Sequence, residues 1–211
     1  MKGLFVSGSG TEVGKTFIAE RLVRLLSKTR SVAVRKPIES DCKTLDEQLV
    51  TKDAVALQKA SNVAEDINRI CCYQFTQCCS GESASSASGV TIGLTDLVKA
   101  CQSDHYVMVE GAGGLLSPIA QDTLNIDLAT ALQLPLVLVV KDELGAVNQA
   151  LLVIKAAEQY KLEIACVVLN QIKGNTLDNA SVIRRYSSCE VVVYNDEAID
   201  LFEQQISQIL I

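Results

Sequence analysis

The stretch GLFVSGSGTEVGKT, residues 3–16, decides the fold of this chain. Its apolar first part, residues 3–8, is typical of a short buried strand, and a glycine-rich turn ending in Gly-Lys-Thr follows at once. The common phosphate-binding loop has four residues between its two outer glycines. Here Ser9 stands at the position of the first glycine, and five residues separate Gly8 from Gly14. The sequence therefore raises the question of whether this is a longer phosphate loop or a chance match.

The turn has every part that a phosphate-binding loop needs. Gly8, Gly10 and Gly14 allow the backbone to turn and to aim its N–H groups inward. A helix that begins near Gly14 offers unpaired N–H donors and the positive end of its dipole to a phosphate. Lys15 adds a mobile positive charge, and Thr16 adds a hydroxyl that can bind Mg²⁺. We therefore predict that this turn binds the phosphates of a nucleotide.

A dinucleotide-binding turn is the rival interpretation, because the same glycines also match Gly-x-Gly-x-x-x-Gly. Lys15 argues against this rival, and so does the end of the next expected strand. A dinucleotide site would have an acid there to bind a ribose, whereas RKPIES, residues 35–40, has Lys36.

Strand-like and helix-like runs of apolar residues alternate along the whole chain. Hydrophobic residues make up 48% of the 211 residues and aromatic residues only 4%, so the core must consist largely of Val, Leu, Ile and Ala. This composition suits a parallel sheet covered by helices. We predict an α/β fold of the P-loop NTPase type, with a mostly parallel β-sheet flanked by helices on both faces, as a single domain over residues 1–211.

The periodicity also predicts the individual elements. Strands are expected at 3–8, 31–38, 106–111, 135–141, 163–172 and 190–195. Helices are expected at 15–29, 51–61, 93–103, 125–132, 146–160, 178–187 and 196–211. The Ser-rich stretch 80–89 is expected to be a mobile loop, either a plain linker or a lid on the substrate side.

Composition limits the partners and the location. A net charge of −6 argues against a general nucleic-acid binder, which would carry basic patches. No run approaches the roughly 18 apolar residues of a membrane-spanning helix, and the first apolar run is too short for a signal peptide. We therefore expect a cytoplasmic protein without a membrane or nucleic-acid partner. Its eight cysteines are expected to be free thiols, since CCYQFTQCC, residues 71–79, lacks the spacing of a zinc motif.

Phosphoryl transfer also requires metal ligands and positive charge. Glu110 ends an expected strand before a Gly-Ala-Gly-Gly turn, where a carboxylate is a suitable Mg²⁺ ligand, or else a solvated acid. Asp53, near the start of an expected helix, is a second candidate ligand, or else an ordinary helix cap. Lys36 ends the second expected strand and either faces an anionic intermediate or is a surface lysine.

The segments that carry this chemistry resemble, in order, those of the dethiobiotin synthetase family. The resemblance rests on GSGTEVGKT, KPIES, DAVALQ, VEGAGGLLSPI, LPLVLVVKDELGAVNQALL and VVLNQI, and it covers residues 1 to 172. The phosphate loop of this family also has five residues between its outer glycines. The resemblance implies an ATP-dependent ligase of biotin biosynthesis, in which 7,8-diaminononanoate captures CO₂ as a carbamate. ATP then phosphorylates the carbamate, and the second amine closes the ureido ring of dethiobiotin.

The resemblance also implies roles for groups of residues. Those implied to surround the reacting groups are Thr11, Glu12, Lys15, Lys36 and Ser40. Those implied to bind ATP are Gly8, Gly10, Thr11, Glu12, Val13, Gly14, Lys15, Thr16, Phe17 and, at the adenine, Asn170. Those implied to hold Mg²⁺ are Thr16, Asp53 and Glu110. Those implied to bind the diamine are Ser40, Gly111, Ala112, Gly113, Gly114 and, for its carboxylate across a homodimer interface, Gly145, Ala146, Val147 and Asn148.

The chain departs from the family pattern at several positions. Gly10 stands where an Asp usually supports the metal site, Asp41 stands in place of Gly, and Gln149 stands in place of His. The C-terminal region lacks the proline-containing loop that usually closes over the adenine, so we expect a loose choice of nucleotide. Two alternatives stay open: a partitioning or metal-delivery ATPase of the deviant P-loop class, and a nucleotide-binding module with weakened catalysis. The ATPase class usually has a second Lys early in the loop, which is missing between Gly8 and Gly14.

Overall fold

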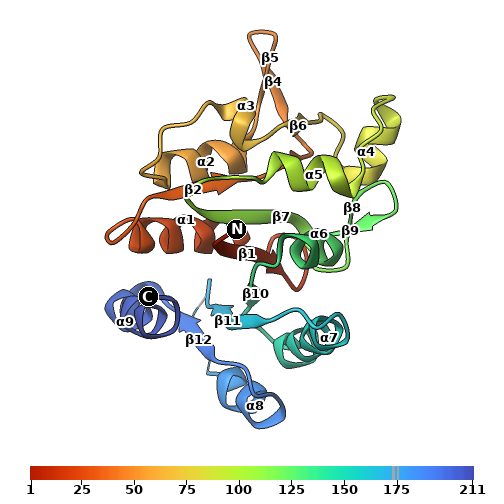
Figure 1. The fold of residues 1–211 in the computed structure, drawn as a ribbon. Coiled ribbons are helices and arrows are strands. Elements are labelled where there is room, and N and C mark those ends of the chain that lie inside the picture. The colour runs from red at the N-terminus through yellow and green to blue at the C-terminus, as the bar shows by residue number, and fades with distance from the viewer. Residues whose placement is uncertain (173, 175) are drawn as a thin grey trace.

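A six-stranded parallel sheet forms the centre of the computed structural model, which describes residues 1–172, 174 and 176–211. The strand order is β12–β11–β10–β1–β7–β2, and each neighbouring pair is parallel (Figure 1). The strands are β1 (Gly3–Gly8), β2 (Val32–Arg35), β7 (Tyr106–Gly114), β10 (Leu136–Lys141), β11 (Ile164–Asn170) and β12 (Val191–Tyr194). The predicted α/β fold with a parallel sheet is confirmed.

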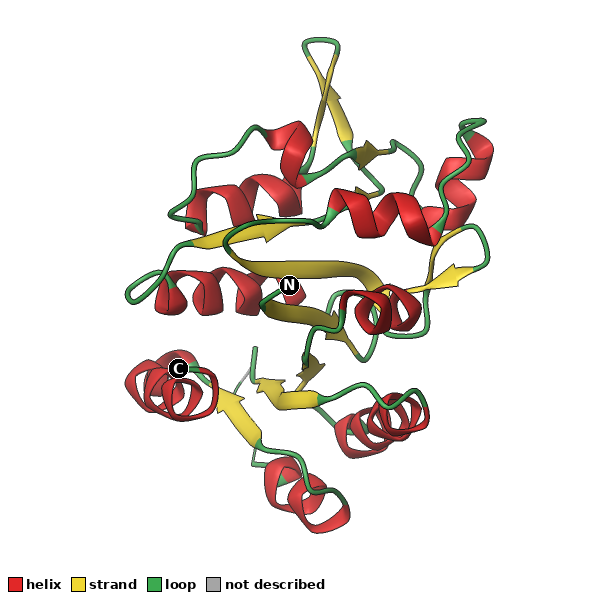
Figure 2. Cartoon of the chain, in the orientation of Figure 1, coloured by secondary structure: helices red, strands yellow, loops and turns green. Residues whose placement is uncertain are grey.

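Helices cover both faces of this sheet (Figure 2). One face packs against α1, α2 and α9 through a core that includes Leu22, Leu57 and Phe202. The other face packs against α5, α6, α7 and α8 through a core that includes Leu97 and Ile154. The helices are α1 (Lys15–Leu26), α2 (Lys52–Ala60), α3 (Ile67–Ile70), α4 (Gly81–Ala87), α5 (Leu94–Ala100), α6 (Asn125–Leu132), α7 (Ala146–Gln159), α8 (Asn179–Tyr186) and α9 (Ile199–Leu210). Within the described ranges, no helix is both long and apolar enough to cross a membrane.

The central strands are apolar because both of their faces are covered. All residues of β1 are buried, and so are all residues of β10 except the last. Helices on both faces leave no solvent-facing side, so a strand of this kind is a continuous apolar run instead of an alternating one. This is why GLFVSG and the run before Lys141 indicate strands despite the lack of alternation.

The Ser-rich stretch 80–89 is not the mobile loop that we predicted, because it contains helix α4. The hydroxyl of Ser80 caps this helix and accepts a hydrogen bond from the backbone N–H of Ser83 at 3.2 Å. Ala84 and Ser85 on the helix are buried. Serine favours helix caps, and burial of the small side chains stabilises a segment whose composition alone suggests a loop.

Two expected strands have different bounds. The strand predicted at 31–38 is interrupted after Arg35, and the chain resumes as β3 (Ile38–Glu39), because Pro37 has no N–H to continue the ladder. The strand predicted at 106–111 continues to Gly114 and pairs along β1. The last expected helix starts with a 3₁₀ turn, Asp196–Ala198, before α9.

Short strands outside the main sheet were not predicted, since runs of two or three residues carry no periodic signal. Two of them, β4 (Lys43–Leu45) and β5 (Gln48–Val50), form an antiparallel hairpin that projects from the body of the fold (Figure 1). The others form the pairs β3 with β6 (Tyr73–Gln74) and β8 (Pro118–Ala120) with β9 (Thr123–Leu124).

The topology places a ligand site at the end of β1. This strand lies between β7 and β10, while the chain continues from it to the edge strand β2. Connections leave β1 and its neighbours in opposite directions at such a switch point, which opens a crevice at the carboxyl ends of the strands. The phosphate loop follows β1 directly and lies at this crevice.

Candidate active site

The phosphate loop runs from Gly8 at the end of β1 to Lys15 at the start of α1. Gly14 has a left-handed conformation with φ of 88°, which favours glycine. A Cβ atom on Gly14 would lie 2.1 Å from Nδ2 of Asn170, so the contact also requires glycine. Asn170, the last residue of β11, donates from Nδ2 to the carbonyl of Val13 at 3.0 Å. These contacts fix the entry into α1, where the first N–H groups of the helix are available to an anion.

Lys15 lies folded back along the loop, with its Nζ donating to the carbonyl of Gly10 at 2.9 Å. Burial, assisted by the positive charge of Lys36, lowers the pKa of Lys15 to about 8. An anion beside Lys15 would favour its charged form and offset this burial. A Cβ atom on Gly10 would meet no described atom within 4 Å, so packing does not demand glycine there. The side chains of Thr11 and Glu12 are exposed at the tip of the loop.

A buried cluster of one lysine and two carboxylates lies next to the loop. The Nζ of Lys36 is 2.6 Å from Oε1 of Glu110 and 3.0 Å from Oδ2 of Asp53. It also donates to the carbonyl of Gly111 at 3.2 Å. The hydroxyl of Thr16 donates to the same Oε1 of Glu110 at 2.8 Å. The structure thus brings together the expected strand-end lysine and the three expected metal ligands.

Strand register brings Lys36 and Glu110 together. Arg35, the last residue of β2, pairs with Val109 of β7, so the residues that follow each of them are neighbours. We predicted that Glu110 ends its strand. It instead lies within β7, opposite Val6 of β1. Its position beside Lys36 therefore depends on pairing between strands and not on the end of a strand.

The cluster is electrostatically coupled. Burial alone would lower the pKa of Lys36, but the carboxylates of Glu110 and Asp53 outweigh burial and raise it above its ordinary value. Burial would raise the pKa of Asp53, but Lys36 outweighs burial and lowers it. Both groups therefore stay charged at neutral pH.

The oxygen atoms of this cluster fit a hard divalent cation. Glu110 is fully buried, and its Oε2 atom has no hydrogen-bond partner within the described part of the chain. Both carboxylates already converge on one cationic group, the amine of Lys36, and the hydroxyl of Thr16 lies beside them. Carboxylate and hydroxyl oxygens near a phosphate loop are the ligands that Mg²⁺ uses in nucleotide sites.

Sequence reasoning missed Glu39, which fixes the position of Asp53. Its carboxylate accepts from the backbone N–H of Asp53 at 2.9 Å and of Ala54 at 3.0 Å. Glu39 therefore caps the first turn of α2, and burial raises its pKa. The helix has no side-chain cap from Thr51, the residue before it. The sequence carries no signal of this contact, because Thr51 is itself a favoured N-cap residue and Glu39 lies fourteen residues before Asp53.

Sequence reasoning also missed Asn125, which holds the glycine-rich end of β7 after Glu110. This fully buried side chain donates from Nδ2 to the carbonyls of Ala112 at 2.7 Å and Gly114 at 2.9 Å. Its Oδ1 accepts from the N–H of Ala112 at 3.1 Å. A Cβ atom on Gly111 would lie 2.4 Å from this oxygen, so Gly111 must be glycine while Asn125 holds this end of β7.

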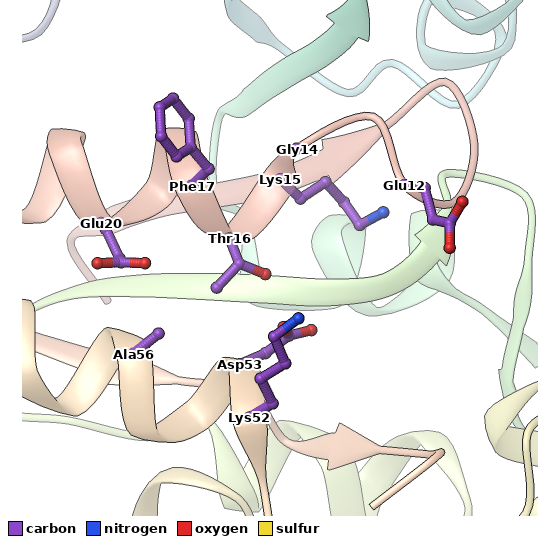
Figure 3. Close-up of a pocket in the computed structure, with 9 residues that line it drawn as sticks. All are labelled: Glu12, Gly14, Lys15, Thr16, Phe17, Glu20, Lys52, Asp53 and Ala56. Carbon is purple, nitrogen blue, oxygen red and sulfur yellow. The ribbon is translucent and has the colours of Figure 1, made fainter. Parts of the chain in front are cut away.

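Ser40, Phe17 and segment 145–148 are expected site residues that lie outside the lysine–carboxylate cluster. Ser40 follows β3, and its hydroxyl donates to the carbonyl of Cys79 at 2.8 Å. The ring of Phe17 points away from the lysines and carboxylates in Figure 3 and packs edge-on against Tyr194, with ring centroids 5.1 Å apart. Segment 145–148 opens α7 and is absent from the lining of the cavity around Lys15, among the described residues.

A cavity of about 410 Å³ opens between the start of α1 and the first turn of α2. Its size is that of a small-molecule site. The residues that line it are Glu12, Gly14, Lys15, Thr16, Phe17, Glu20, Lys52, Asp53 and Ala56 (Figure 3). The cavity therefore joins the phosphate loop to the carboxylate cluster.

Asn125→Ala should destabilise the protein, because the carbonyls of Ala112 and Gly114 lose a buried donor. Each buried group left unsatisfied costs about 1–3 kcal/mol. Chemical denaturation followed by circular dichroism measures the loss in free energy of unfolding. Asn148→Ala, at an exposed asparagine, is the matched control and should change this free energy by less than about 0.5 kcal/mol. Equal stability of the two variants would contradict the role of Asn125.

Comparison with known proteins bears on the fold and the family of the chain. A family model described as an AAA domain matches residues 2–194. Two solved structures, a plasmid partition protein from Borrelia burgdorferi and a ParA family ATPase from Chlorobium tepidum, have similar folds. The first has a TM-score of 0.59 at 12% identity and covers 100% of this chain and 99% of that chain. The second has a TM-score of 0.55 at 13% identity and covers 99% of this chain and 93% of that chain. At such identities the likeness shows the fold alone.

Sequence relatives show the family. The chain is 56% identical to the ATP-dependent dethiobiotin synthetase BioD of Vesicomyosocius okutanii, over 100% of this chain and 98% of the relative. It is 52% identical to the ATP-dependent dethiobiotin synthetase BioD of Ruthia magnifica, over 100% of this chain and 99% of the relative. With this identity along its full length, the chain belongs to the family of ATP-dependent dethiobiotin synthetases.

Proposed function

We propose that this protein is a dethiobiotin synthase that joins 7,8-diaminononanoate and CO₂ in a reaction driven by ATP. ATP-dependent synthesis of dethiobiotin, a step in biotin biosynthesis, follows from the family. The observation that carries the proposal for the site is the Lys36 amine, held between Glu110 and Asp53 beside a phosphate loop.

The proposed reaction has three steps. One amine of the diamine attacks the carbon of CO₂ and loses a proton, which gives a carbamate. A carbamate oxygen then attacks the terminal phosphorus of ATP, ADP leaves, and a carbamic-phosphoric anhydride forms. The second amine attacks the carbamoyl carbon, inorganic phosphate leaves with the bonding electrons, and the ureido ring is closed.

The proposed roles of the lysines follow from the charges that must meet. The carbamate and the terminal phosphate are both anions, so positive groups between them lower the barrier. Lys15 would bind the phosphates of ATP, whose negative charge would offset the burial that lowers the pKa of Lys15 to about 8. Lys36 would face the carbamate and the transferred phosphoryl group, with Thr11, Glu12 and Ser40 around them.

Mg²⁺ is proposed to bind Thr16, Asp53 and Glu110. The support is the convergence of their oxygen atoms and the buried Oε2 of Glu110, which lacks a partner among the described residues. When bound, Mg²⁺ would neutralise charge on the phosphate oxygens. Glu39 would keep Asp53 in place through the first turn of α2.

Asn170 is proposed to meet the adenine of ATP. Its Oδ1 is buried and has no hydrogen-bond partner within the described ranges, so it suits the amino group of a base. Beyond β12, the chain passes through Asp196–Ala198 directly into α9. All three prolines, at 37, 118 and 135, lie elsewhere, which supports the prediction of a loose choice of nucleotide.

A homodimer is proposed to complete the diamine site. The carboxylate of the substrate would bind the segment Gly145–Asn148 of the partner subunit, where α7 begins. The first N–H groups of a helix suit a carboxylate. A cytoplasmic location also remains our proposal.

A switch ATPase is the alternative with the same fold. Its partitioning relatives share 12–13% identity with this chain, which bears on the fold and not on the activity. The loop lacks the early second lysine of that class. The identity to dethiobiotin synthetases therefore outweighs the structural likeness to partition proteins.

Phosphate release should depend on the diamine. Purified protein with bicarbonate and Mg-ATP should release phosphate only after 7,8-diaminononanoate is added, because the carbamate is the phosphoryl acceptor. A coupled phosphate assay measures this directly. Release without the diamine would favour the switch ATPase, and no release at all would favour a module with weakened catalysis.

Lys15→Ala and Lys36→Ala should each lower the rate of diamine-dependent phosphate release by about 10²–10³-fold, because each removes charge stabilisation in the transition state. Lys28→Ala, at an exposed lysine paired with Glu203, is the control that should retain activity. Steady-state kinetics on folded variants gives the comparison. Losses below about tenfold at both Lys15 and Lys36 would rule out the proposed roles.

CTP or GTP should replace ATP with only moderate loss. The short connection between β12 and α9 leaves few groups to contact the edge of the base. We expect kcat/KM for ATP to exceed that for the other nucleotides by less than about a hundredfold, which is the discrimination of a site with few base contacts. A larger preference for ATP would mean that other residues recognise the adenine.

A further inference from the structure

Lys52 contributes a positive charge to the cavity beside the phosphate loop. It is the first residue of α2 and lines the same cavity as Lys15, Thr16 and Asp53. Figure 3 shows its side chain extending from α2 into the gap between α1 and α2. Within the described ranges, no carboxylate lies within 4.0 Å of its amine. Its three N–H donors are therefore available to a ligand of the cavity.

The position of Lys52 does not favour the helix that it begins. The N-terminus of a helix carries a partial positive charge, so acids stabilise the first turn and cations destabilise it. Asp53 and Glu39 satisfy this rule at α2, and Lys59 satisfies the opposite rule in the last turn. Lys52 is the residue of α2 that opposes the dipole. An anion bound in the cavity would offset this repulsion.

The other two lysines of the site leave a place for a third cation. The Lys36 amine already contacts Glu110, Asp53 and the carbonyl of Gly111. Lys15 lies on the phosphate-loop side of the cavity, in contact with Gly10. Of these three lysines, only Lys52 lies on the side of the cavity that α2 forms. Phosphate oxygens that point away from the loop would face this side.

We propose that Lys52 binds the terminal phosphate of ATP from the side opposite the phosphate loop. The inference rests on the proposed function only in that the cavity holds ATP. Since ADP lacks the terminal phosphate, the interaction should distinguish ATP from ADP. Lys52 is exposed at the mouth of the cavity. It would therefore also be able to contact the phosphate that is released after ring closure.

The test compares nucleotide affinity in the full-length protein and its Lys52→Ala variant by titration calorimetry with Mg²⁺. The probes are a non-hydrolysable ATP analogue, AMPPNP, and ADP. Loss of one charge-assisted contact should weaken binding of AMPPNP by about tenfold, and binding of ADP by less than about twofold. Lys52→Arg should retain most of the affinity for AMPPNP, because its charge can still reach the phosphate.

Lys59→Ala is the matched control, since it removes the same charge from the last turn of the same helix. It should leave both affinities unchanged. The Lys52→Ala variant should melt at the same temperature as the wild type or higher, whereas a structural role would lower its melting temperature. Equal losses for AMPPNP and ADP, or no loss for either, would overturn the proposal.

The assay contains no diamine, so it is independent of the proposed reaction. If the wild type binds AMPPNP but makes no dethiobiotin, the proposed function fails and the test of Lys52 still stands. If the wild type makes dethiobiotin and Lys52→Ala shows no selective loss, the inference about Lys52 fails alone. If the wild type binds neither nucleotide, both proposals are wrong.

Discussion

The buried charge of Lys36 is the constraint on which the site depends. Lys36 is only 3% exposed, and an ammonium group is costly to bury unless carboxylates accompany it. Glu110 and Asp53 meet this need, and each comes from a different element. The register between β2 and β7 must be correct for Glu110, and the start of α2 must be fixed for Asp53. Removal of one partner would leave an uncompensated charge in the interior, so these elements are held together electrostatically as well as by their apolar cores.

The cluster also links the fold to its chemistry. A charged group fixed by three acceptors has little freedom, so it is already oriented before a substrate binds. The phosphate loop joins this centre through Thr16, which contacts Glu110 directly. Preorganised charge of this kind is more effective in a site shielded from water than charge on a mobile side chain. The fold alone does not decide this chemistry, because partition ATPases have a similar fold.

Local signals made the fold and the phosphate loop predictable. The strand, glycines, Lys15 and helix of residues 3–26 are adjacent in sequence, and strands buried on both faces are apolar runs. The sequence also made it possible to predict that Lys36, Asp53 and Glu110 belong to the site, because a lysine and acids beside turns suggest a phosphate and metal site. The distances between these three residues could not be predicted, since Lys36 contacts Glu110 only because Arg35 pairs with Val109.

Long-range contacts account for what the sequence did not reveal. Glu39 caps α2 from fourteen residues before Asp53, and Asn125, at the start of α6, holds the glycine-rich end of β7. Neither contact has a local pattern. The Ser-rich stretch misled for the opposite reason: its composition indicates a loop, whereas Ser80 caps a helix on which Ala84 and Ser85 are buried. Capping and burial outweighed composition there.

The identity of the product tests most directly whether this site joins CO₂ to a diamine with the energy of ATP. The protein is incubated with ¹³C-labelled bicarbonate, 7,8-diaminononanoate and Mg-ATP, and the products are analysed by mass spectrometry. Dethiobiotin should appear with the label in its ureido carbonyl, and phosphate should be released in equal amount. Phosphate release without labelled dethiobiotin would contradict the proposed reaction.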